Sequence, residues 1–417
     1  MLALFLFVGA CSSSSPEITG VTITDAHPVV GQRVLLRVLA QSDNPPLRYI
    51  WHGRGGVFQS TDDDFSADEP TDQYYVYWVP TSASGSAVSC TVIDDEDEEE
   101  SHEFSLHVRE RALETLVDAD LVLMGKDPHV LIGGVLAGVK NQDFIYYTST
   151  DTTDFDWGKS YFDWDLDPLS VVMMTSSRSY YYSVSYVWAV YQDSGQWILV
   201  SRGSSDTTTY DTPFSDDGVS AVTKMDVNGT RIWVGTDKGL YAYSTAAKEW
   251  IDPADPVNQI INDLAVVGGD VYVATEAGIY YSEDNGETWL KFAGTGDTKA
   301  ITGYYDINLE TVTIYALTEE TAGSATYTIR CFNSAGTLLS EPGYPPDSYS
   351  WIEGLDTDPL GNLWFGKWTW NTAQGWDNPS GKDDTADHIV RSLVSPEGLV
   401  YLQTNSGALM VWGKRGD

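Results

Sequence analysis

The stretch SEDNGETW, residues 282–289, holds three carboxylates, one amide and a glycine, and it ends in a tryptophan. Carboxylates spaced this closely could act as general acid and base, or bind a divalent cation. Acid–base hydrolysis needs two carboxylates in one cleft whose pKa values differ. The chain contains 61 Asp and Glu residues, so close spacing alone identifies no such pair. The sequence therefore predicts no catalytic residues, and we expect the protein not to be an enzyme.

Two further acidic segments could bind a cation. Residues 151–167 combine clustered aspartates with Trp157 and Trp164. We interpret them as a turn and a solvated connection, with a cation site or a carbohydrate patch as alternatives. Residues 94–100, DDEDEEE, are interpreted as a solvated hairpin loop because the spaced carboxylates and bend glycine of a calcium loop are absent. We predict no cofactor, with weak Ca²⁺ binding on these loops as the alternative.

Thiols and imidazoles give no metal signature. The three cysteines, Cys11, Cys90 and Cys331, lie far apart, and the sequence has no CxxC pair. The six histidines include no HExxH spacing, so we predict no zinc site.

Aromatic side chains in polar segments are candidates for ligand binding. Residues 367–384 read as a glycine-bearing loop with three tryptophans, and residues 177–188 contain three consecutive tyrosines. Exposed Trp and Tyr beside Asp and Asn can stack on sugars or form the centre of a protein interface. The alternative is packing inside the fold. The candidate binding surface comprises Trp368, Trp370, Trp376, Tyr180, Tyr181 and Tyr182.

The elements that position these residues recur along the chain. An apolar residue followed by Tyr or Trp occurs seven times, at Tyr146, Trp188, Trp233, Tyr272, Tyr315, Trp364 and Tyr401. These aromatic positions are 37 to 49 residues apart, near the blade length of about 40–50 residues in β-propellers. Glycine-containing turns precede several of them, as hairpins require. We predict an all-β chain with a seven-bladed β-propeller over residues 118–417.

The end of the chain predicts how the ring closes. Only sixteen residues follow Tyr401, too few to complete a blade. We expect the last blade to take its outer strand from the N-terminal side, near residues 118–126, because closure removes an open sheet edge. Residues 109–117 are then expected to be a linker.

Two motifs resemble known propeller repeats. IWVGTDKGLYAYS (residues 232–244) and DPLGNLWFG (residues 358–366) resemble repeats in sensor domains of bacterial two-component regulators. SEDNGETW resembles the Asp-box, S-x-D-x-G-x-T-W, of sialidases and related propellers. The matching residues are Ser282, Asp284, Gly286, Thr288 and Trp289. The resemblance implies a structural turn on the outer rim, with the tryptophan between blades. Sialidase activity is not expected, because the arginines that bind the substrate carboxylate in that family have no clear counterpart.

Residues 16–108 predict a smaller β domain. Short strands with turn signals between them, a central Trp51 and a late strand with Cys90 are typical of a two-sheet sandwich. The stretch resembles Ig-like or PKD-like domains of bacterial surface lipoproteins. In antibody-type domains a cysteine at the position of Cys90 forms a disulfide. The expected partner strand, RVLLRVLA, has none, so we predict a buried thiol.

The N-terminus predicts the compartment. Residues 2–8 form an apolar run too short to span a bilayer but suited to a signal peptide. The sequence VGAC that follows resembles the lipobox of bacterial lipoproteins, which implies lipidation of Cys11. Ser12–Ser15 then resembles a flexible tether, so residues 1–15 are expected to be signal peptide, lipidated cysteine and tether. Ser rather than Asp after Cys11 favours the outer membrane.

Charge narrows the choice of partner. The formal net charge of −38 repels nucleic acid, so we expect no nucleic-acid partner. We expect a cell-envelope lipoprotein, anchored in the outer membrane by its lipid, whose propeller is a non-enzymatic binding or scaffolding platform for another envelope protein. Glycan or ligand binding is the alternative, and a propeller hydrolase or lyase is a third hypothesis.

Overall fold

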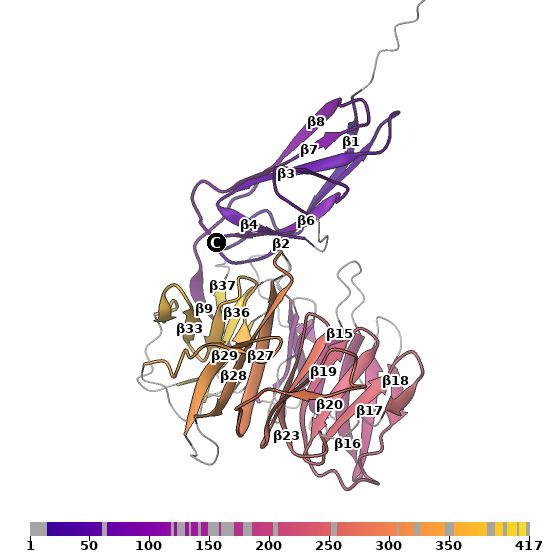
Figure 1. The fold of residues 1–417 in the computed structure, drawn as a ribbon, viewed down its shortest axis with the longest axis vertical. Coiled ribbons are helices and arrows are strands. Elements are labelled where there is room, and N and C mark those ends of the chain that lie inside the picture. The colour runs from indigo at the N-terminus through magenta and orange to yellow at the C-terminus, as the bar shows by residue number, and fades with distance from the viewer. Residues whose placement is uncertain are drawn as a thin grey trace, which may run out of the picture. The chain divides into compact units, whose positions relative to one another are not determined.

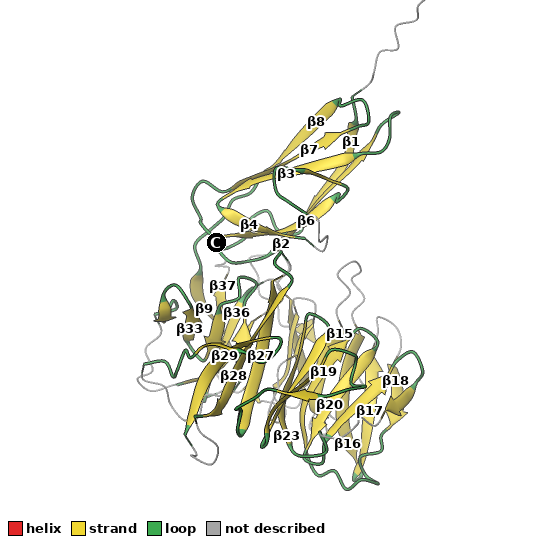
Figure 2. Cartoon of the chain, in the orientation of Figure 1, coloured by secondary structure: helices red, strands yellow, loops and turns green. Residues whose placement is uncertain are grey.

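The computed structural model places the chain in two compact units, unit 1 (Met1–Glu110) and unit 2 (Arg111–Asp417). All elements in the described residues are β-strands (Figures 1 and 2). No helix in this part of the chain is long and apolar enough to cross a lipid bilayer. The structure describes residues 15–60, 65–117, 121–122, 130–132, 135–140, 143–148, 158–159, 171–177, 186–202, 207–251, 257–306, 308–320, 326–346, 354–381, 388–394, 398–406 and 408–413.

Unit 1 consists of two four-stranded antiparallel sheets. The first has the order β1 (Glu17–Ile23), β2 (Val34–Gln41), β6 (Tyr75–Pro80) and β4 (Gly56–Gln59). The second has the order β5 (Pro70–Thr71), β3 (Arg48–Arg54), β7 (Ala87–Ile93) and β8 (Glu99–Phe104). Side chains alternate between the two faces of a strand, so each sheet can bury one face.

Both sheets contribute to one core, so unit 1 is a β-sandwich. Trp78 from the first sheet and Trp51 and Cys90 from the second are fully buried in it. The Trp51 ring stacks on Phe104 at 6.0 Å, and its indole N–H donates to the Gln73 carbonyl. Cys90 is a free thiol, and burial raises its pKa to about 12. It is therefore a small apolar core residue.

Unit 2 is a succession of antiparallel sheets. The described residues form seven, each in chain order apart from the first and the last. The first contains β10 (Leu121–Val122), β11 (Val130–Ile132), β12 (Val135–Lys140), β13 (Asp143–Thr148) and β14 (Gly158–Lys159). The second contains β15 (Val171–Ser177), β16 (Tyr186–Asp193), β17 (Gln196–Arg202) and β18 (Thr207–Asp211). The third contains β19 (Val222–Asn228), β20 (Arg231–Thr236), β21 (Leu240–Ser244) and β22 (Glu249–Ile251).

The remaining sheets repeat this plan. The fourth contains β23 (Ile261–Val267), β24 (Asp270–Thr275), β25 (Gly278–Ser282) and β26 (Leu290–Lys291). The fifth contains β27 (Thr298–Asp306), β28 (Thr311–Glu319), β29 (Tyr327–Asn333) and β30 (Leu338–Ser340). The sixth contains β31 (Asp356–Thr357), β32 (Leu363–Phe365), β33 (Trp368–Asn371) and β34 (Gly375–Asp377). The last contains β35 (Ile389–Val394), β36 (Val400–Thr404), β37 (Leu409–Gly413) and β9 (Ala112–Val117).

In the first sheet β11 contacts the first strand of the second sheet, and from there the first strand of each sheet contacts the first strand of the next. These inner strands are β11, β15, β19, β23, β27, β31 and β35, in that order of contact. Within a sheet the chain reverses direction from each strand to the next, so after four strands it is back at the end of unit 2 where the sheet began. All inner strands therefore begin at the same end of unit 2, which we call the leading mouth.

The last sheet confirms that a strand from the N-terminal side completes it, but at a different place from the one predicted. Its outer strand is β9, which pairs with β37 through Leu113 opposite Trp412. We expected residues 118–126 in this position and a linker at 109–117. The prediction was wrong because the aromatic repeat marks second strands, whereas β9 is an outer strand that the repeat cannot locate. Residues 112–117 are therefore part of the last sheet of unit 2.

The predicted repeat anchors mark second strands in six sheets and fail in the first. Trp233 in β20, Tyr272 in β24 and Tyr401 in β36 illustrate the six. Tyr146 instead lies in β13, the third strand of its sheet, because the second strand, VLAGVK, has no aromatic residue. The regular spacing at this point of the chain is coincidental.

Candidate binding site at the leading mouth

Five inner strands share a β-bulge close to the leading mouth. In each, pairing with the second strand shifts by one residue just after the strand begins. A bulge turns a side chain out of the regular alternation, and bulges are common beside functional sites. The bulged residues are Val172, Thr223, Asn262, Lys299 and Val390.

Two bulged residues meet in one polar cluster between the fourth and fifth sheets. The Asn262 amide donates to Asp297 Oδ1 at 3.3 Å and to the Thr298 carbonyl at 2.7 Å. Lys299 Nζ lies 2.6 Å from Asp297 Oδ2, and the Tyr327 hydroxyl donates to the same oxygen at 2.7 Å. We call Asn262, Asp297, Lys299 and Tyr327 the Asp297 cluster.

The electrostatics of the Asp297 cluster suit binding rather than proton transfer. Burial acts to lower the pKa of Lys299, but the hydrogen bond and charge of Asp297 outweigh it and raise the pKa. Burial, and then the hydrogen bond to Asp297, raise the pKa of Tyr327. At neutral pH the lysine therefore stays charged and the tyrosine stays protonated. The cluster offers an ammonium, an amide, a hydroxyl and a carboxylate to a polar ligand.

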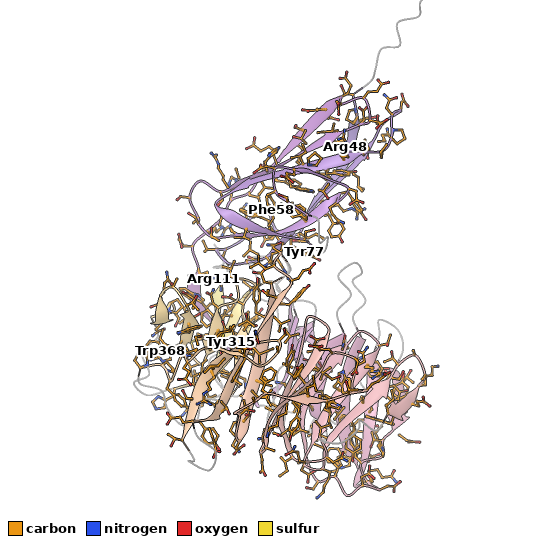
Figure 3. All side chains as sticks on the ribbon, viewed as in Figure 1. Arg48, Phe58, Tyr77, Arg111, Tyr315 and Trp368 are labelled. Atoms are coloured by element: carbon orange, nitrogen blue, oxygen red, sulfur yellow. The ribbon has the colours of Figure 1, made fainter. Side chains whose placement is uncertain are left out.

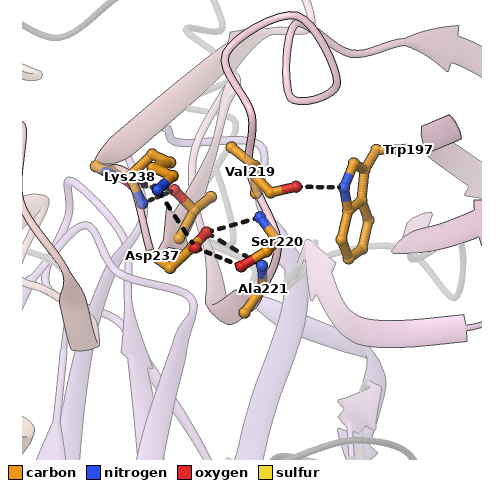
Figure 4. A network of polar contacts seen from close by, with 8 residues as sticks. Trp197, Val219, Ser220, Ala221, Asp237 and Lys238 are labelled. Atoms are coloured by element: carbon orange, nitrogen blue, oxygen red, sulfur yellow. Dashed lines mark hydrogen bonds and ion pairs between the residues drawn. The ribbon is translucent and has the colours of Figure 1, made fainter. Parts of the chain in front are cut away.

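The rim of the leading mouth is held by short polar networks. Asp237, in the turn after β20, accepts the backbone N–H groups of Ser220 and Ala221 at 3.0 and 3.1 Å and the Ser220 hydroxyl at 2.6 Å (Figure 4). Burial opposes ionisation, but these hydrogen bonds prevail and lower the pKa of Asp237. Trp197 donates its indole N–H to the Val219 carbonyl of the same loop. These hydrogen bonds hold the loop at residues 219–221 against the ends of β17 and β20.

Aspartates within inner strands link consecutive sheets, and no sequence motif indicated them. Asp226, Asp263 and Asp356 each accept the N–H of the residue that follows. Each also accepts an N–H from the inner strand of the next sheet, at 2.9, 2.9 and 2.7 Å respectively. An acidic residue inside a strand-like apolar stretch is the signal that could have revealed them.

The structure corrects the predicted tryptophan surface. Residues 368–377 are two outer strands rather than a loop, and Trp370 pairs directly with Trp376. Trp370 is only 7% exposed and packs against Tyr315, while the Trp376 indole donates to the Pro342 carbonyl. Trp368 is half-buried at the edge of unit 2, with Lys367 Nζ 5.4 Å from its ring centroid (Figure 3). Tyr180, Tyr181 and Tyr182 lie outside the described residues.

The SEDNGETW turn follows the third strand, β25, and therefore lies at the end of unit 2 opposite the leading mouth. Asp284 accepts the Ser282 hydroxyl at 2.8 Å, the Thr288 hydroxyl at 2.6 Å and the Thr288 N–H at 2.8 Å. The Thr288 hydrogen bonds, followed by that of Ser282, lower the pKa of Asp284 to about 2. Trp289 meets the Trp233 ring of the preceding sheet edge-on at 6.1 Å. The Asp284 carboxylate therefore accepts hydrogen bonds from residues of its own turn and stabilises that turn.

The acidic loops form hydrogen-bonded turns where they are described. Asp94 accepts N–H groups from Glu96 and Glu98 and the Ser42 hydroxyl, which together outweigh burial and lower its pKa. Arg48 pairs with Asp97 at 2.9 Å. Across the described residues, no group of three or more His, Cys, Asp or Glu side chains could hold a metal ion. Cys11 and nearly all of residues 151–167 lie outside this part of the chain.

Comparison with known proteins identifies the fold. No protein-family model and no curated protein matches the chain. Among solved structures, YCF48 bound to D1 peptide matches with a TM-score of 0.50 and 9% identity, over 73% of this chain and 98% of that one. This likeness and the succession of four-stranded sheets show that unit 2 is a β-propeller.

Two further matches have lower TM-scores. The extracellular domain of a putative hybrid two-component system from B. thetaiotaomicron matches with a TM-score of 0.46 and 14% identity, over 72% of this chain and 39% of that one. A GH74 enzyme from Niastella koreensis matches with a TM-score of 0.47 and 13% identity, over 70% of this chain and 53% of that one. At these identities the matches concern the fold alone.

Proposed function

We propose that the protein is an exported lipoprotein whose seven-bladed propeller binds a protein partner, without catalysis, at the leading mouth. The Asp297 cluster carries the proposal. It joins two sheets at the beginning of their inner strands and combines donors and acceptors within hydrogen-bond distance of one another. Such a set can recognise the polar groups of a peptide or loop.

Other observations support the rest of the assignment. Seven sheets in the described residues, with β9 completing the last, support a seven-bladed ring. A sandwich core with Trp51 and Cys90 supports an Ig-like unit 1. The apolar run, Cys11 and the serine tether support anchoring through an N-terminal lipid in the outer membrane.

The alternatives are less well supported. Glycan binding would need exposed tryptophan rings on the sixth sheet. Trp370 and Trp376 pack against the core of unit 2, which leaves Trp368 as the remaining candidate of the three. A hydrolase or lyase would need a second carboxylate for acid–base work, whereas Asp297 is paired with an ammonium and a phenol. A protein partner is also in keeping with the YCF48 propeller, whose solved structure has D1 peptide bound to it.

Site-specific cross-linking in native membranes tests the proposal. A photo-reactive phenylalanine analogue is placed at Glu276, an exposed turn residue at the leading mouth, or at Glu287, an exposed residue at the opposite end. We expect one partner to cross-link from position 276 and not from position 287. Lys299→Glu should weaken that cross-link, because it places a second negative charge beside Asp297.

The matched control is Lys291→Glu, which makes the same charge change on the outer strand β26. It should leave the cross-link intact. Cross-linking from position 287 alone, or equal loss in both lysine variants, would contradict binding at the leading mouth.

A further inference from the structure

The sixth sheet carries accessible aromatic rings where it reaches the leading mouth. There β32 ends and β33 begins, and Phe365 pairs with Trp368 across the turn that joins the two strands. Residues paired directly across antiparallel strands place their side chains on the same face of a sheet. Tyr344, in the connection from the fifth sheet, packs on Phe365 with the ring centroids 6.0 Å apart. Tyr344 and Trp368 therefore both lie beside Phe365 at this mouth.

These two rings are accessible, although Phe365 is not. Phe365 is 1% exposed, whereas Tyr344 is 41% exposed and Trp368 is half-buried at the edge of unit 2 (Figure 3). We call Tyr344 and Trp368 the aromatic rim. The rim is linked to the Asp297 cluster, because Tyr327 of that cluster packs against the same hydrophobic core as Phe365. A partner bound at the leading mouth is expected to contact both.

The aromatic rim has unused hydrogen-bond donors. Within the described part of the chain, neither the Trp368 indole N–H nor the Tyr344 hydroxyl has a hydrogen-bond partner. Other indole N–H groups are used inside the fold, since those of Trp51, Trp197 and Trp376 donate to backbone carbonyls. Tyrosine and tryptophan combine an apolar ring with a polar edge. The rim therefore offers ring surface together with donors, and a matching ligand has apolar groups together with free acceptors.

Proline-rich segments in the polyproline II conformation have this combination. They form no internal hydrogen bonds, so their carbonyls are free acceptors, and proline itself has no N–H that would need a partner. Their rings dock on aromatic-lined surfaces in several classes of peptide-binding domain. The sixth sheet already shows this pairing within the chain, because the Trp376 indole donates to the Pro342 carbonyl at 2.8 Å.

An uncharged segment also suits the charge near the rim. Beyond the Asp297 cluster, the described charged residues at this end of the fifth and sixth sheets are the carboxylates Glu319, Glu320, Glu341, Asp356 and Asp377 and the cations Arg330 and Lys367. Arg330 pairs with Glu341 at 3.0 Å, and Lys367 Nζ lies over the Trp368 ring. Carboxylates outnumber cations here, which disfavours an acidic segment. Proline carries no charge, so binding at the rim needs no ion pair.

We propose that the aromatic rim binds a proline-rich segment of the partner in the polyproline II conformation. Its pyrrolidine rings pack on Tyr344 and Trp368, and its carbonyls accept from the Tyr344 O–H and the Trp368 N–H. This inference rests on the proposed function and specifies the chemistry of the partner at the same mouth. The Asp297 cluster then binds polar groups next to this segment.

Fluorescence anisotropy on the full chain tests the proposal. The probe is fluorescein-labelled decaproline, which adopts polyproline II, and its counterpart is a flexible Gly-Ser peptide of equal length. We expect only decaproline to bind, with an affinity that NaCl leaves nearly unchanged, because no ion pair forms. Trp368→Ala and Tyr344→Ala should each weaken binding about tenfold, as loss of a central interface aromatic residue does. Trp368→Phe, which keeps a ring but lacks the indole N–H, should weaken it less.

Tyr305→Ala is the matched control for Tyr344→Ala, since Tyr305 is a comparably exposed tyrosine at the opposite end of unit 2. It should leave the affinity unchanged, and thermal melts check that the variants compared are folded. Absence of decaproline binding, or equal loss in the two tyrosine variants, overturns the proposal. Trp368-dependent binding of cellohexaose without binding of decaproline would assign the rim to a glycan instead. Cross-linking from position 276 without decaproline binding would overturn this inference and leave protein binding at the leading mouth intact.

Discussion

Single residues of the SEDNGETW turn are constrained by backbone conformation and by close approach. Gly286 has φ of +85°, where side chains are disfavoured, and a Cβ there would lie 2.5 Å from the Trp233 ring. Asp284 uses its carboxylate within the same turn. The role of each residue follows from its immediate neighbours.

Gly286→Ala is therefore expected to destabilise unit 2 by more than about 1 kcal/mol, because it adds a steric clash to the cost of the left-handed backbone. Urea denaturation measures the change. The control is Gly294→Ala, where φ is +73° and a Cβ meets nothing within 4 Å. Equal losses in the two variants would show that contact with Trp233 is unimportant.

The ionisation of Asp284 gives a pH dependence with a defined sign. Its pKa is about 2 in the folded chain and about 3.9 in an unfolded one, so the stability it contributes is present above pH ~4. That contribution is lost as the pH falls through the window between these values. We expect Asp284→Asn to lower the melting temperature at pH 7 and to match the wild type at pH 2. A difference that persists unchanged at pH 2 would mean that the ionised form is not what stabilises the turn.

At the scale of elements, β9 is the critical strand, because it covers the otherwise open edge of β37. A chain that begins at Arg111 keeps β9, and one that begins at Asp118 lacks it. We expect the first to unfold cooperatively and the second to lose cooperative unfolding and aggregate through β37. Thermal melts and light scattering at several protein concentrations measure this. Identical behaviour of the two chains would show that the ring is complete without β9.

At the scale of the whole molecule, the net charge of −38 conceals a local segregation of charge. The leading mouth holds Lys299 against Asp297, with Lys299 Nζ 2.6 Å from Asp297 Oδ2. Charges are screened over about 8 Å at physiological salt, so the potential at this site is set mainly by the Asp297 cluster and its immediate neighbours. Lys299→Glu therefore tests this local arrangement, and Lys291→Glu on β26 controls for the change in net charge.

The sequence by itself determined the features of the fold that depend on residues close together in the chain. Strand alternation, glycine turns and the recurring aromatic position in second strands are local, so they predicted the all-β class and the succession of sheets. They failed at Tyr146, because the second strand of the first sheet has no aromatic residue, and at β9, because the aromatic signal does not mark outer strands.

Only the tertiary structure decided which side chains meet. Trp368 and Trp370 are two residues apart in one polar stretch. Trp370 is nonetheless buried against Tyr315, whereas Trp368 is half-exposed. The Asp297 cluster joins residues of two sheets. Two of them, Asn262 and Lys299, lie at β-bulges that no sequence motif predicts. Burial and side-chain direction depend on contacts between residues distant in sequence, and local backbone preference does not determine those contacts.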